Sequence, residues 1–486
     1  MSSHLSPVRT RFAPSPTGYL HVGTARTALY SYLFARRHGG TFVLRIEDTD
    51  VARNVEGGAD EIAEMLAWLG IRWDEGYGVG GPYGPYRQSE RLDRYHTAVN
   101  ALIAHGQAYP CYCTAEEIQR RKTAAGRDLP PGYDGYCRNL SSSQLKAYEA
   151  EGRKAAVRFR MPDEGETVVH DLIRGDIVFQ NSTLTDFVLM RADGTPTYMF
   201  AVVYDDLDMA ISHVIRGEDL LPSTPRQVHV FRALGRAEPP MFAHLPLLVG
   251  ADRKKLSKRR HQVALEDYRA QGFLPEAMVN YLALLGWGYD ETTEHFTLEE
   301  LEQVFSLERV SRNPAMFDDA KLEALNGWYI RRLDPRDLAN RLVPFMVRAG
   351  YDDPDVELLA RAAPLIAERI TRLDQAPDML GFLLTDRVEP APEEAAKVLT
   401  DEARSFLDAA VKVLRPLEPW TDEAIERTLR ELADEQELKP RKAFQPIRLA
   451  ITGRLVSPPL FESMELLGRE RSLARLEQAS ASALRR

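Results

Sequence analysis

The chain has 486 residues, of which 44% are hydrophobic and 28% charged, so it is long enough for about three or more domains of ordinary globular composition. Lysine and arginine number 62 against 72 aspartates and glutamates, and the net charge of −10 argues against indiscriminate binding to nucleic acid, although basic residues can still gather on one face. No apolar run is long enough to span a bilayer, the first residues MSSHLSPVRT lack a signal-peptide core, and the three cysteines cannot all pair with one another, so we expect a cytoplasmic protein without a disulfide framework.

The segment Arg9–Asp50 predicts a strand, a loop, a helix and a second strand. Polar and apolar residues alternate over its first five positions, and the prolines and glycine that follow end the strand. Apolar residues then fall on one helical face until Gly39-Gly40, and the second strand covers Thr41–Ile46. Such a βαβ unit binds its ligand at the carboxyl ends of the strands, beside the start of the helix.

The start of this helix, His21-Val22-Gly23-Thr24, predicts a phosphate site. Free backbone N–H groups and the helix dipole at that point favour an anion. Gly23 lets a ligand approach the backbone closely, and His21 can donate a hydrogen bond to a phosphate oxygen. The alternative is that His21 only caps the helix.

The βα pattern breaks near Pro110, and from there to about Gly194 the sequence predicts short strands and turns inserted into the nucleotide-binding fold. Cys111, Cys113 and Cys137 lie in this insertion. Structural zinc takes four good ligands, so three thiols alone are one short.

After the insertion, Asp208–Ile215 alternates as a strand near the core does, and Arg216 begins the turn at its end. The alternative interpretation is that Arg216 is an ordinary arginine in a solvated turn. The position of Arg216 after a strand of a doubly wound sheet favours contact with a ligand.

A basic loop, KKLSKR, covers residues 254–259. A mobile loop of this kind can bring ammonium groups to a triphosphate and stabilise the charge that develops there. Taken alone, a basic pentapeptide is usually a solvated turn.

Beyond Gly250 the pattern is almost entirely helical. Helices are predicted over 275–285, 298–305, 315–325 and 337–349, and further helices continue to the last residues, with breaks at prolines 354, 390, 392, 458 and 459.

Three segments of the chain resemble the glutamyl-tRNA synthetases, a branch of the class I aminoacyl-tRNA synthetases. They are PSPTGYLHVGTART with RIEDTD, then TYMFAVVYDDLDMAISHVIRGEDLLPSTPRQ, then KLSKR. HVGT is similar to the His-x-Gly-His motif with Thr24 in place of the second histidine, and KLSKR to the KMSKS loop with Leu256 and Arg259 as changes. The resemblance covers essentially the whole chain. The all-helical tail is typical of the bacterial glutamyl type, whereas the related glutaminyl enzymes end in β-barrels.

The fold that this resemblance implies is α/β: a class I Rossmann-like nucleotide-binding fold with an inserted α+β acceptor-binding domain, followed by all-α anticodon-binding domains. The expected boundaries are 1–109 and 195–250 for the two halves of the catalytic domain, 110–194 for the acceptor-stem-binding insertion, 251–333 for a stem-contact region with the KLSKR loop, and 334–396 and 397–486 for two helical anticodon-binding domains.

The activity implied is ATP-dependent ligation of L-glutamate to tRNA-Glu through a glutamyl-adenylate, with Mg²⁺ beside the phosphates and a monomer as the working form. ATP would be bound by His21, Gly23, Thr24, Lys255, Ser257 and Lys258, of which His21, Lys255 and Lys258 would be catalytic. Glutamate would be bound by Arg11, Ala13, Ser15, Glu47, Tyr198, Val202 and Arg216. The resemblance places Arg11 on the side-chain carboxylate and Glu47 on the ammonium group. Some relatives have asparagine at the position of Val202.

Some relatives bind zinc in the insertion, with a histidine two residues after the last cysteine as the fourth ligand. That position is Asn139 here, and asparagine is a poor zinc ligand, so the sequence predicts little zinc and three reduced cysteines.

Arg369 is the residue that the resemblance connects with the anticodon. Glutamyl enzymes that reject tRNA-Gln have an arginine at about this point, near the third anticodon base, which is cytosine in tRNA-Glu and guanine in tRNA-Gln. The alternative is that Arg369, on a predicted helix with Arg361, belongs to a solvated basic face.

Two other functions stay open. An adenylyltransferase of the same superfamily that never binds tRNA leaves a helical tail of about 150 residues unexplained. A non-catalytic RNA-binding relative would be expected to have lost His21, Lys258 or Glu47, and all three are present. Whether tRNA-Gln is also charged stays open as well.

Overall fold

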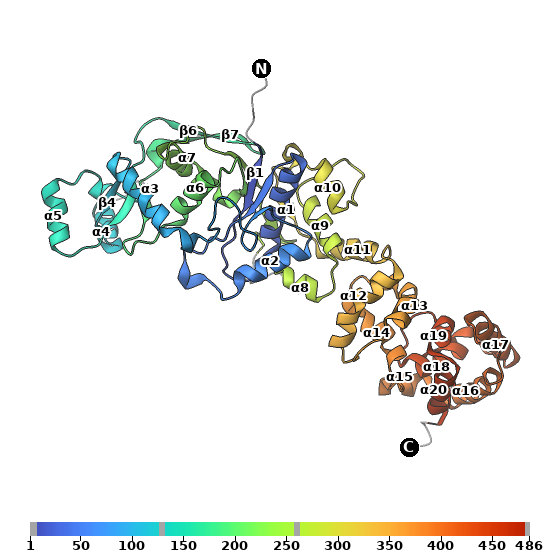
Figure 1. The fold of residues 1–486 in the computed structure, drawn as a ribbon. Coiled ribbons are helices and arrows are strands. Elements are labelled where there is room, and N and C mark those ends of the chain that lie inside the picture. Colours follow the sequence, from blue (N-terminus) through green and yellow to red (C-terminus); the bar gives the residue numbers. More distant parts are fainter. Residues whose placement is uncertain (1–6, 126–131, 257–262, 482–486) are drawn as a thin grey trace. The chain divides into compact units, whose positions relative to one another are not determined.

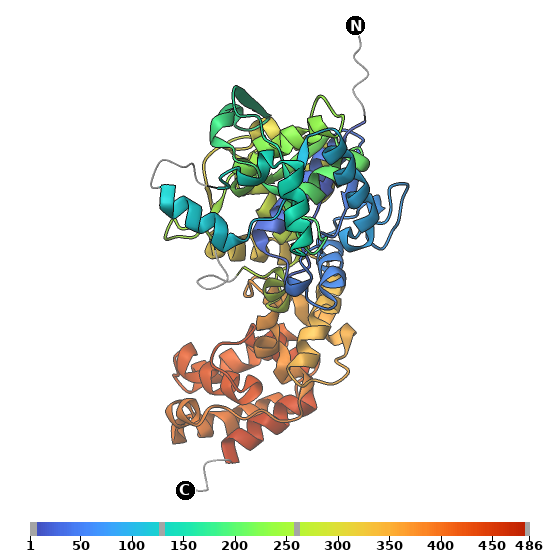
Figure 2. The same ribbon diagram turned by 90° about the vertical axis from the view of Figure 1, so that its left-hand side faces the viewer.

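The computed structural model describes residues 7–125, 132–256 and 263–481. By contacts the chain divides into two compact units, drawn in Figures 1 and 2. Unit 1 comprises Met1–Asp267 and Met278–Asp318, and unit 2 comprises Tyr268–Ala277 and Asp319–Arg486. The division falls inside the expected stem-contact region, 251–333. No helix in the described ranges is long and apolar enough to cross a membrane.

Unit 1 is built around a parallel sheet. Strand β1 (Arg9–Phe12) pairs with β2 (Thr41–Leu44), which pairs with β3 (Glu75–Gly76). Strand β9 (His213–Gly217) pairs with β10 (Met241–Leu245). The N–H of Ser212 donates to the carbonyl of Arg9 at 2.9 Å and so joins the two groups of strands in the order β3-β2-β1-β9-β10. The carboxyl ends of β1, β2 and β9 therefore meet at one edge.

Helix α1 (Val22–Arg37) packs on β1, β2 and β9. Its buried face includes Leu29 and Leu33, as the helical period predicts. Gly39 has a φ of +60°, and a Cβ on Gly40 would collide with the carbonyl of Val8, so the chain turns back into β2 through two glycines.

Other helices and short strands complete unit 1. They are α2 (Gly58–Trp68), α3 (Leu92–Ala104), α6 (Tyr198–Asp208), α7 (Thr224–Ala233), β11 (Leu248–Val249), α10 (Leu298–Val304) and β12 (Ala315–Met316). Helices α8 (Leu265–Ala270) and α9 (Pro275–Leu284) cross the division between the units. The prediction of a helix from 315 was wrong at its start, because Ala315 and Met316 pair with β11 and α11 (Asp319–Ile330) begins after them.

The insertion contains an antiparallel sheet of β4 (Ala108–Cys111), β5 (Ala156–Phe159) and β8 (Val188–Met190). A hairpin of β6 (Glu166–Asp171) and β7 (Gly175–Gln180) extends the parallel sheet, because β6 pairs with β10. Two helices, α4 (Ala115–Ala125) and α5 (Ser142–Ala150), were not predicted. None of their described residues is buried, so they carry no apolar stripe for a sequence pattern to reveal.

Unit 2 is helical in every described element, in agreement with the all-α prediction, and its residues from about 335 on are drawn in orange and red in Figure 1. After α11 its helices are α12 (Pro335–Arg348), α13 (Val356–Ala367), α14 (Ala376–Leu380), α15 (Pro392–Val398), α16 (Asp401–Leu414), α17 (Asp422–Glu435), α18 (Pro440–Thr452), α19 (Leu460–Leu467) and α20 (Arg469–Ala481). One cluster of buried apolar residues runs from Leu274 to Ala479, across the boundary expected at residue 396.

Candidate functional site

Four charged side chains meet where β1 and β2 end. Arg11 donates through Nε and Nη2 to the two oxygens of Asp206, at 3.1 and 3.3 Å. Arg45 is completely buried; its Nη2 lies 2.9 Å from Oε1 of Glu47 and its Nη1 lies 2.8 Å from Oδ1 of Asp206. Burial alone would lower the pKa of Arg45, but the carboxylates of Asp206 and Glu47 outweigh burial and raise it. Asp205 also lies 3.8 Å from Nε of Arg45 and is paired with Arg91 at 2.7 Å, so this buried network contains three arginines and three carboxylates.

The Glu47 carboxylate differs from that of Asp206 in its electrostatic surroundings. Burial raises the pKa of Glu47, against the opposing effect of Arg45. Burial acts in the same sense on Asp206, but Arg11 and Arg45 together lower its pKa. An added cation beside Glu47 would favour its ionised form further.

Arg216, the fourth residue of β9, is a buried cation held by neutral groups. Its Nε lies 3.1 Å from Nε2 of His244, and its Nη2 lies 2.9 Å from Oγ1 of Thr224 and 2.7 Å from Oε1 of Gln227. Among the described residues no carboxylate forms an ion pair with Arg216, although its side chain is only 4% exposed. Burial lowers the pKa of Arg216, but a guanidinium stays charged at neutral pH.

His244 helps to fix the orientation of the Arg216 side chain. Because Nε2 of His244 accepts from Arg216, the ring proton belongs on Nδ1, which lies 2.6 Å from Oδ2 of Asp171. Both His244 and Asp171 are buried. The sequence analysis found neither residue.

Tyr198 begins α6 and lies in the same charged region. Burial raises its pKa, and the charges of Arg216, Glu47 and Arg11 act on it. Val202, one turn further along α6, is buried in the apolar core and offers no hydrogen bond to a ligand. Ala13 and Ser15 follow β1, where Ala13 is half-buried and Ser15 is exposed.

His21 caps α1: its Nδ1 accepts the N–H of Gly23 at 2.9 Å. The ring proton then belongs on Nε2, where it can be donated to a ligand. The capping alternative is thus observed, through the nitrogen that the phosphate role does not use. Thr24 donates its hydroxyl to the carbonyl of His21 at 2.7 Å.

The two flanks of the KLSKR loop are anchored to the nucleotide-binding fold. On the C-terminal side, the carbonyl of Val263 accepts the N–H of Val22 at 2.9 Å, and Leu265 donates to Leu20 at 2.9 Å. On the N-terminal side, Leu256 donates to Leu248 at 3.0 Å. The loop therefore begins and ends beside the start of α1. Ser257 and Lys258, two of the predicted ATP-binding residues, lie outside the described residues.

Lys255 is held near the turn that follows β9. Its Nζ lies 3.0 Å from Oδ2 of Asp219, with both side chains about half exposed. A pair this exposed contributes little to stability and can exchange for another anion.

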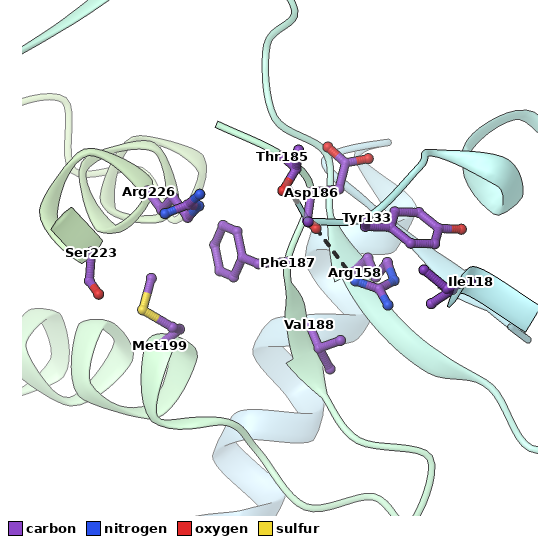
Figure 3. Close-up of a pocket in the computed structure, with 11 residues that line it drawn as sticks. Ile118, Tyr133, Arg158, Thr185, Asp186, Phe187, Val188, Met199, Ser223 and Arg226 are labelled. Carbon is purple, nitrogen blue, oxygen red and sulfur yellow. Dashed lines mark hydrogen bonds between the residues drawn. The ribbon is translucent and has the colours of Figure 1, made fainter. Parts of the chain in front are cut away.

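A cavity of about 500 Å³ lies between the insertion and helices α6 and α7 (Figure 3). Met199, Ser223 and Arg226 line it from the catalytic side, and Tyr133, Arg158 and Phe187 are among its residues from the insertion. Three of its lining residues are neighbours in sequence of site residues: Met199 follows Tyr198, and Ser223 and Arg226 directly precede Thr224 and Gln227, which hold Arg216.

The three cysteines of the insertion come together. Their sulfur atoms all lie within 4.8 Å of one another, and none is in a disulfide. Asn139, at the position considered for a fourth ligand, is exposed and accepts a hydrogen bond from Arg160 at 3.3 Å.

Arg369 does not lie on a helix, in contrast to the prediction. Helix α13 ends at Ala367, and Arg369 follows in the turn, exposed. Its charge contributes, after burial, to the lowered pKa of Arg448 on α18, which places two arginines near each other in unit 2.

The sequence analysis missed Arg45 and Asp206 as well as His244. Arg45 stands two residues before Glu47 and thus on the same side of an extended chain, and Asp206 stands two turns after Tyr198 on α6. Either spacing could have identified these residues from the sequence, as neighbours of Glu47 and Tyr198.

The comparisons with known proteins agree over the whole chain. The family model for the catalytic domain of class I tRNA synthetases (E and Q) matches residues 7–324, and that for an anticodon binding domain matches residues 337–480. A glutamate–tRNA ligase of Nocardioides sp. is 48% identical over 99% of this chain and 100% of its own, and one of Dehalococcoides mccartyi is 46% identical over 98% of each. The crystal structure of a glutamate tRNA ligase from Elizabethkingia meningosepticum in complex with its amino acid is similar with a TM-score of 0.87 and 33% identity, covering 98% of this chain and 99% of that one.

Proposed function

The chain belongs to the class I tRNA synthetases of the glutamate and glutamine type, and we infer from this that it is a glutamate–tRNA ligase. Such an enzyme joins the carboxylate of L-glutamate to the α-phosphate of ATP, releasing pyrophosphate. A hydroxyl of the terminal adenosine of tRNA-Glu then attacks the acyl carbon and releases AMP. The matched anticodon binding domain argues against an adenylyltransferase that never binds tRNA.

The charge of the site is the observation that carries the choice of amino acid. Arg11, Arg45, Glu47 and Asp206 pair with one another, whereas Arg216 has no direct carboxylate partner among the described residues, and buried Asp171 reaches it only through His244. L-Glutamate has two carboxylates and one ammonium group, a net charge of −1. Glutamate would give both Arg11 and Arg216 an anion, whereas glutamine, which keeps only its α-carboxylate, would leave one of the two buried arginines facing a neutral amide.

We assign the contacts accordingly. Asp206 occupies the Nε and Nη2 edge of Arg11, so Nη1 is the edge that would face the side-chain carboxylate of glutamate. Arg216 would supply the second cation, Glu47 would bind the ammonium group, and Tyr198 would add a hydrogen bond. Ala13 and Ser15 would contribute from the backbone after β1, and Val202 only apolar contact.

Adenylate formation needs no nucleophile from the protein. His21 Nε2 and the N–H groups at the start of α1, including Gly23 and Thr24, would orient the phosphates, and Mg²⁺ arriving with ATP would neutralise part of their charge. Lys258, with Lys255 and Ser257 beside it, would stabilise the leaving pyrophosphate. The anchored flanks of the loop, both beside α1, support this role.

The tRNA terminus would enter the cavity between the insertion and α7. About 500 Å³ accommodates one nucleotide, Phe187 offers a surface for base stacking, and Arg158 and Arg226 offer positive charge to the phosphates. Met199, which lines the cavity, follows Tyr198 of the charged site, and this supports placing the terminal hydroxyl on the side of the activated carboxyl group. We further propose a monomer that acts in the cytoplasm, where its substrates are.

ATP–pyrophosphate exchange with each amino acid, with and without tRNA, tests the proposal. We expect glutamate to support exchange only when tRNA is present, and glutamine to fail under both conditions. Brisk exchange with glutamine would refute the choice of amino acid. Full exchange without RNA would refute only the tRNA requirement, and no exchange with any amino acid would favour the non-catalytic relative.

A further inference from the structure

Asp171 is the last residue of β6, in the hairpin by which the insertion extends the parallel sheet. Its buried carboxylate accepts from N–H groups on both sides. Oδ1 accepts the backbone N–H groups of Ile173 and Arg174, at 2.9 and 2.8 Å. Oδ2 accepts the backbone N–H of His244 at 3.0 Å and lies 2.6 Å from Nδ1 of the His244 ring. The carboxylate therefore joins the turn of the hairpin to strand β10.

Asp171 and His244 share one arrangement of protons. Burial alone would raise the pKa of Asp171, but the hydrogen bonds from His244 and from the backbone outweigh burial and lower that pKa, so the carboxylate is ionised. Burial lowers the pKa of His244, against the opposing effect of Asp171, so the ring is neutral at neutral pH. An ionised carboxylate only accepts hydrogen bonds, so the single ring proton lies on Nδ1, and Nε2 keeps a lone pair.

The lone pair of His244 Nε2 faces the Arg216 guanidinium. Nε of Arg216 lies 3.1 Å from Nε2, and the hydroxyl oxygen of Thr224 lies 3.2 Å from the same nitrogen. Thr224 and Gln227 accept from Nη2 of Arg216, at 2.9 and 2.7 Å. No side chain or carbonyl among the described residues accepts from Nη1 of Arg216, so the three neutral partners leave this nitrogen for a ligand.

The other tautomer of His244 would disturb this geometry. With the ring proton on Nε2, an N–H of His244 would face the Nε–H of Arg216, and two donors at 3.1 Å repel each other. The partner of Nδ1 decides which tautomer forms, and within the described part of the chain that partner is Asp171. The orientation of Arg216 thus depends on a carboxylate that does not contact it.

We propose that Asp171 is a positioning residue for the amino acid: by fixing the tautomer of His244 it holds Arg216 in the orientation that binds a ligand carboxylate. The hairpin of the insertion then takes part in binding glutamate without touching it. The proposal rests on the proposed function, because glutamate is the ligand assigned to Arg216.

Asp171→Asn tests the proposal in the full chain, because it keeps the size of the side chain and turns one oxygen into a donor. Facing the turn, the new NH₂ group would meet two backbone N–H groups that cannot adapt. Facing His244 it meets a ring that can adapt, by moving its proton to Nε2. In tRNA-dependent ATP–pyrophosphate exchange we expect the KM for glutamate to rise about tenfold or more, and kcat to change less than about threefold.

Asp176→Asn is the matched control. Asp176 lies in the same hairpin, and its Oδ1 is 2.7 Å from Nδ1 of His170, but these two side chains are 66% and 67% exposed. The substitution removes the carboxylate of an aspartate–histidine pair that does not reach Arg216, so the KM for glutamate should stay at the parental value.

His244→Gln separates an effect through the ring from an effect on the fold. The carbonyl oxygen of glutamine can accept from Arg216 whichever residue stands at position 171. In the His244→Gln background, Asp171→Asn should therefore change the KM for glutamate by less than about twofold. ¹⁵N NMR of the histidine rings shows the tautomer directly: the signal that His244→Gln removes should belong to a ring protonated on Nδ1 in the parent, and on Nε2 in Asp171→Asn.

A parental KM in Asp171→Asn would overturn the proposal, and so would a parent ring protonated on Nε2. A rise in KM without a change of tautomer, or a full further rise on top of His244→Gln, would assign Asp171 to the stability of the hairpin and overturn it as well. Failure of the proposed function differs from all of these: the parent would then exchange with no amino acid while its His244 ring kept the Nδ1 proton.

Discussion

At the scale of single residues, the site depends on charges that are buried before any substrate arrives. Arg216 is oriented by three neutral partners and has no carboxylate of its own among the described residues, whereas Arg11 and Arg45 are neutralised within the protein. Removing water from an ion costs free energy that hydrogen bonds to neutral groups offset in part and a bound anion offsets further. The site is thus prepared for an acidic ligand.

Arg216→Lys tests whether the buried guanidinium of Arg216 binds the acidic ligand. Lysine keeps the charge but cannot reach His244, Thr224 and a ligand carboxylate together, so we expect the KM for glutamate to rise about tenfold to a hundredfold, the equivalent of one charged hydrogen bond of about 1.5–3 kcal/mol. Steady-state exchange kinetics measure it. Arg232→Lys, an exposed position on α7, is the control and should leave the KM unchanged. An unchanged KM in Arg216→Lys would remove Arg216 from the glutamate site.

Arg45→Met should destabilise unit 1 strongly. The substitution leaves Glu47 and Asp206 buried without one of their cations, and breaking a buried ion pair in this way costs about 3–5 kcal/mol. Urea unfolding followed by tryptophan fluorescence measures the change. Arg53→Met is the control, since the Arg53 side chain is 71% exposed and its pair with Asp50 contributes at most about 1 kcal/mol. Equal effects would mean that the buried network is not what stabilises the site.

At the scale of elements, the sequence predicted the helices and strands whose pattern lies within a short stretch of residues. The strand–helix–strand unit around α1 and the helical tail follow from the spacing of apolar residues and the positions of glycines, and the structure confirms them. Helices α4 and α5 were missed because they bury none of their described residues.

The KLSKR loop gives the prediction at this scale. Because its flanks are hydrogen-bonded beside the start of α1, Lys258 should act on the phosphates and not on glutamate. Lys258→Ala should lower the rate of adenylate formation about a hundredfold, or about 3 kcal/mol, with little change in the KM for glutamate. Single-turnover kinetics separate the two quantities. Lys254→Ala, an exposed neighbour, should change the rate little; a loss confined to the KM in Lys258→Ala would assign the lysine to glutamate binding.

At the scale of the whole molecule, choice of tRNA is expected to reside in unit 2, far along the chain from the chemistry. In that unit Arg369 is exposed, and its charge contributes, after burial, to the lowered pKa of Arg448, so a nucleic acid bound there would offset positive charge. Arginine's donors can pair with the acceptor edge of an unstacked cytosine, but they leave the donor groups of guanine unpaired.

On that hypothesis Arg369→Gln should charge tRNA-Gln better while tRNA-Glu loses little, because one lost discriminating contact is equivalent to about 1–3 kcal/mol. The ratio of kcat/KM for the two tRNAs measures it. Arg361→Gln is the matched control, since Arg361 is exposed on α13. If both tRNAs lost activity equally, Arg369 would only neutralise phosphate.

The single apolar cluster of unit 2 has a consequence for whether that unit can be divided. Because buried residues from Leu274 to Ala479 form one cluster, the helices on both sides of residue 396 share one apolar core. A chain interrupted near residue 396 would therefore expose apolar surface on both fragments. Neither fragment would have a complete core of its own.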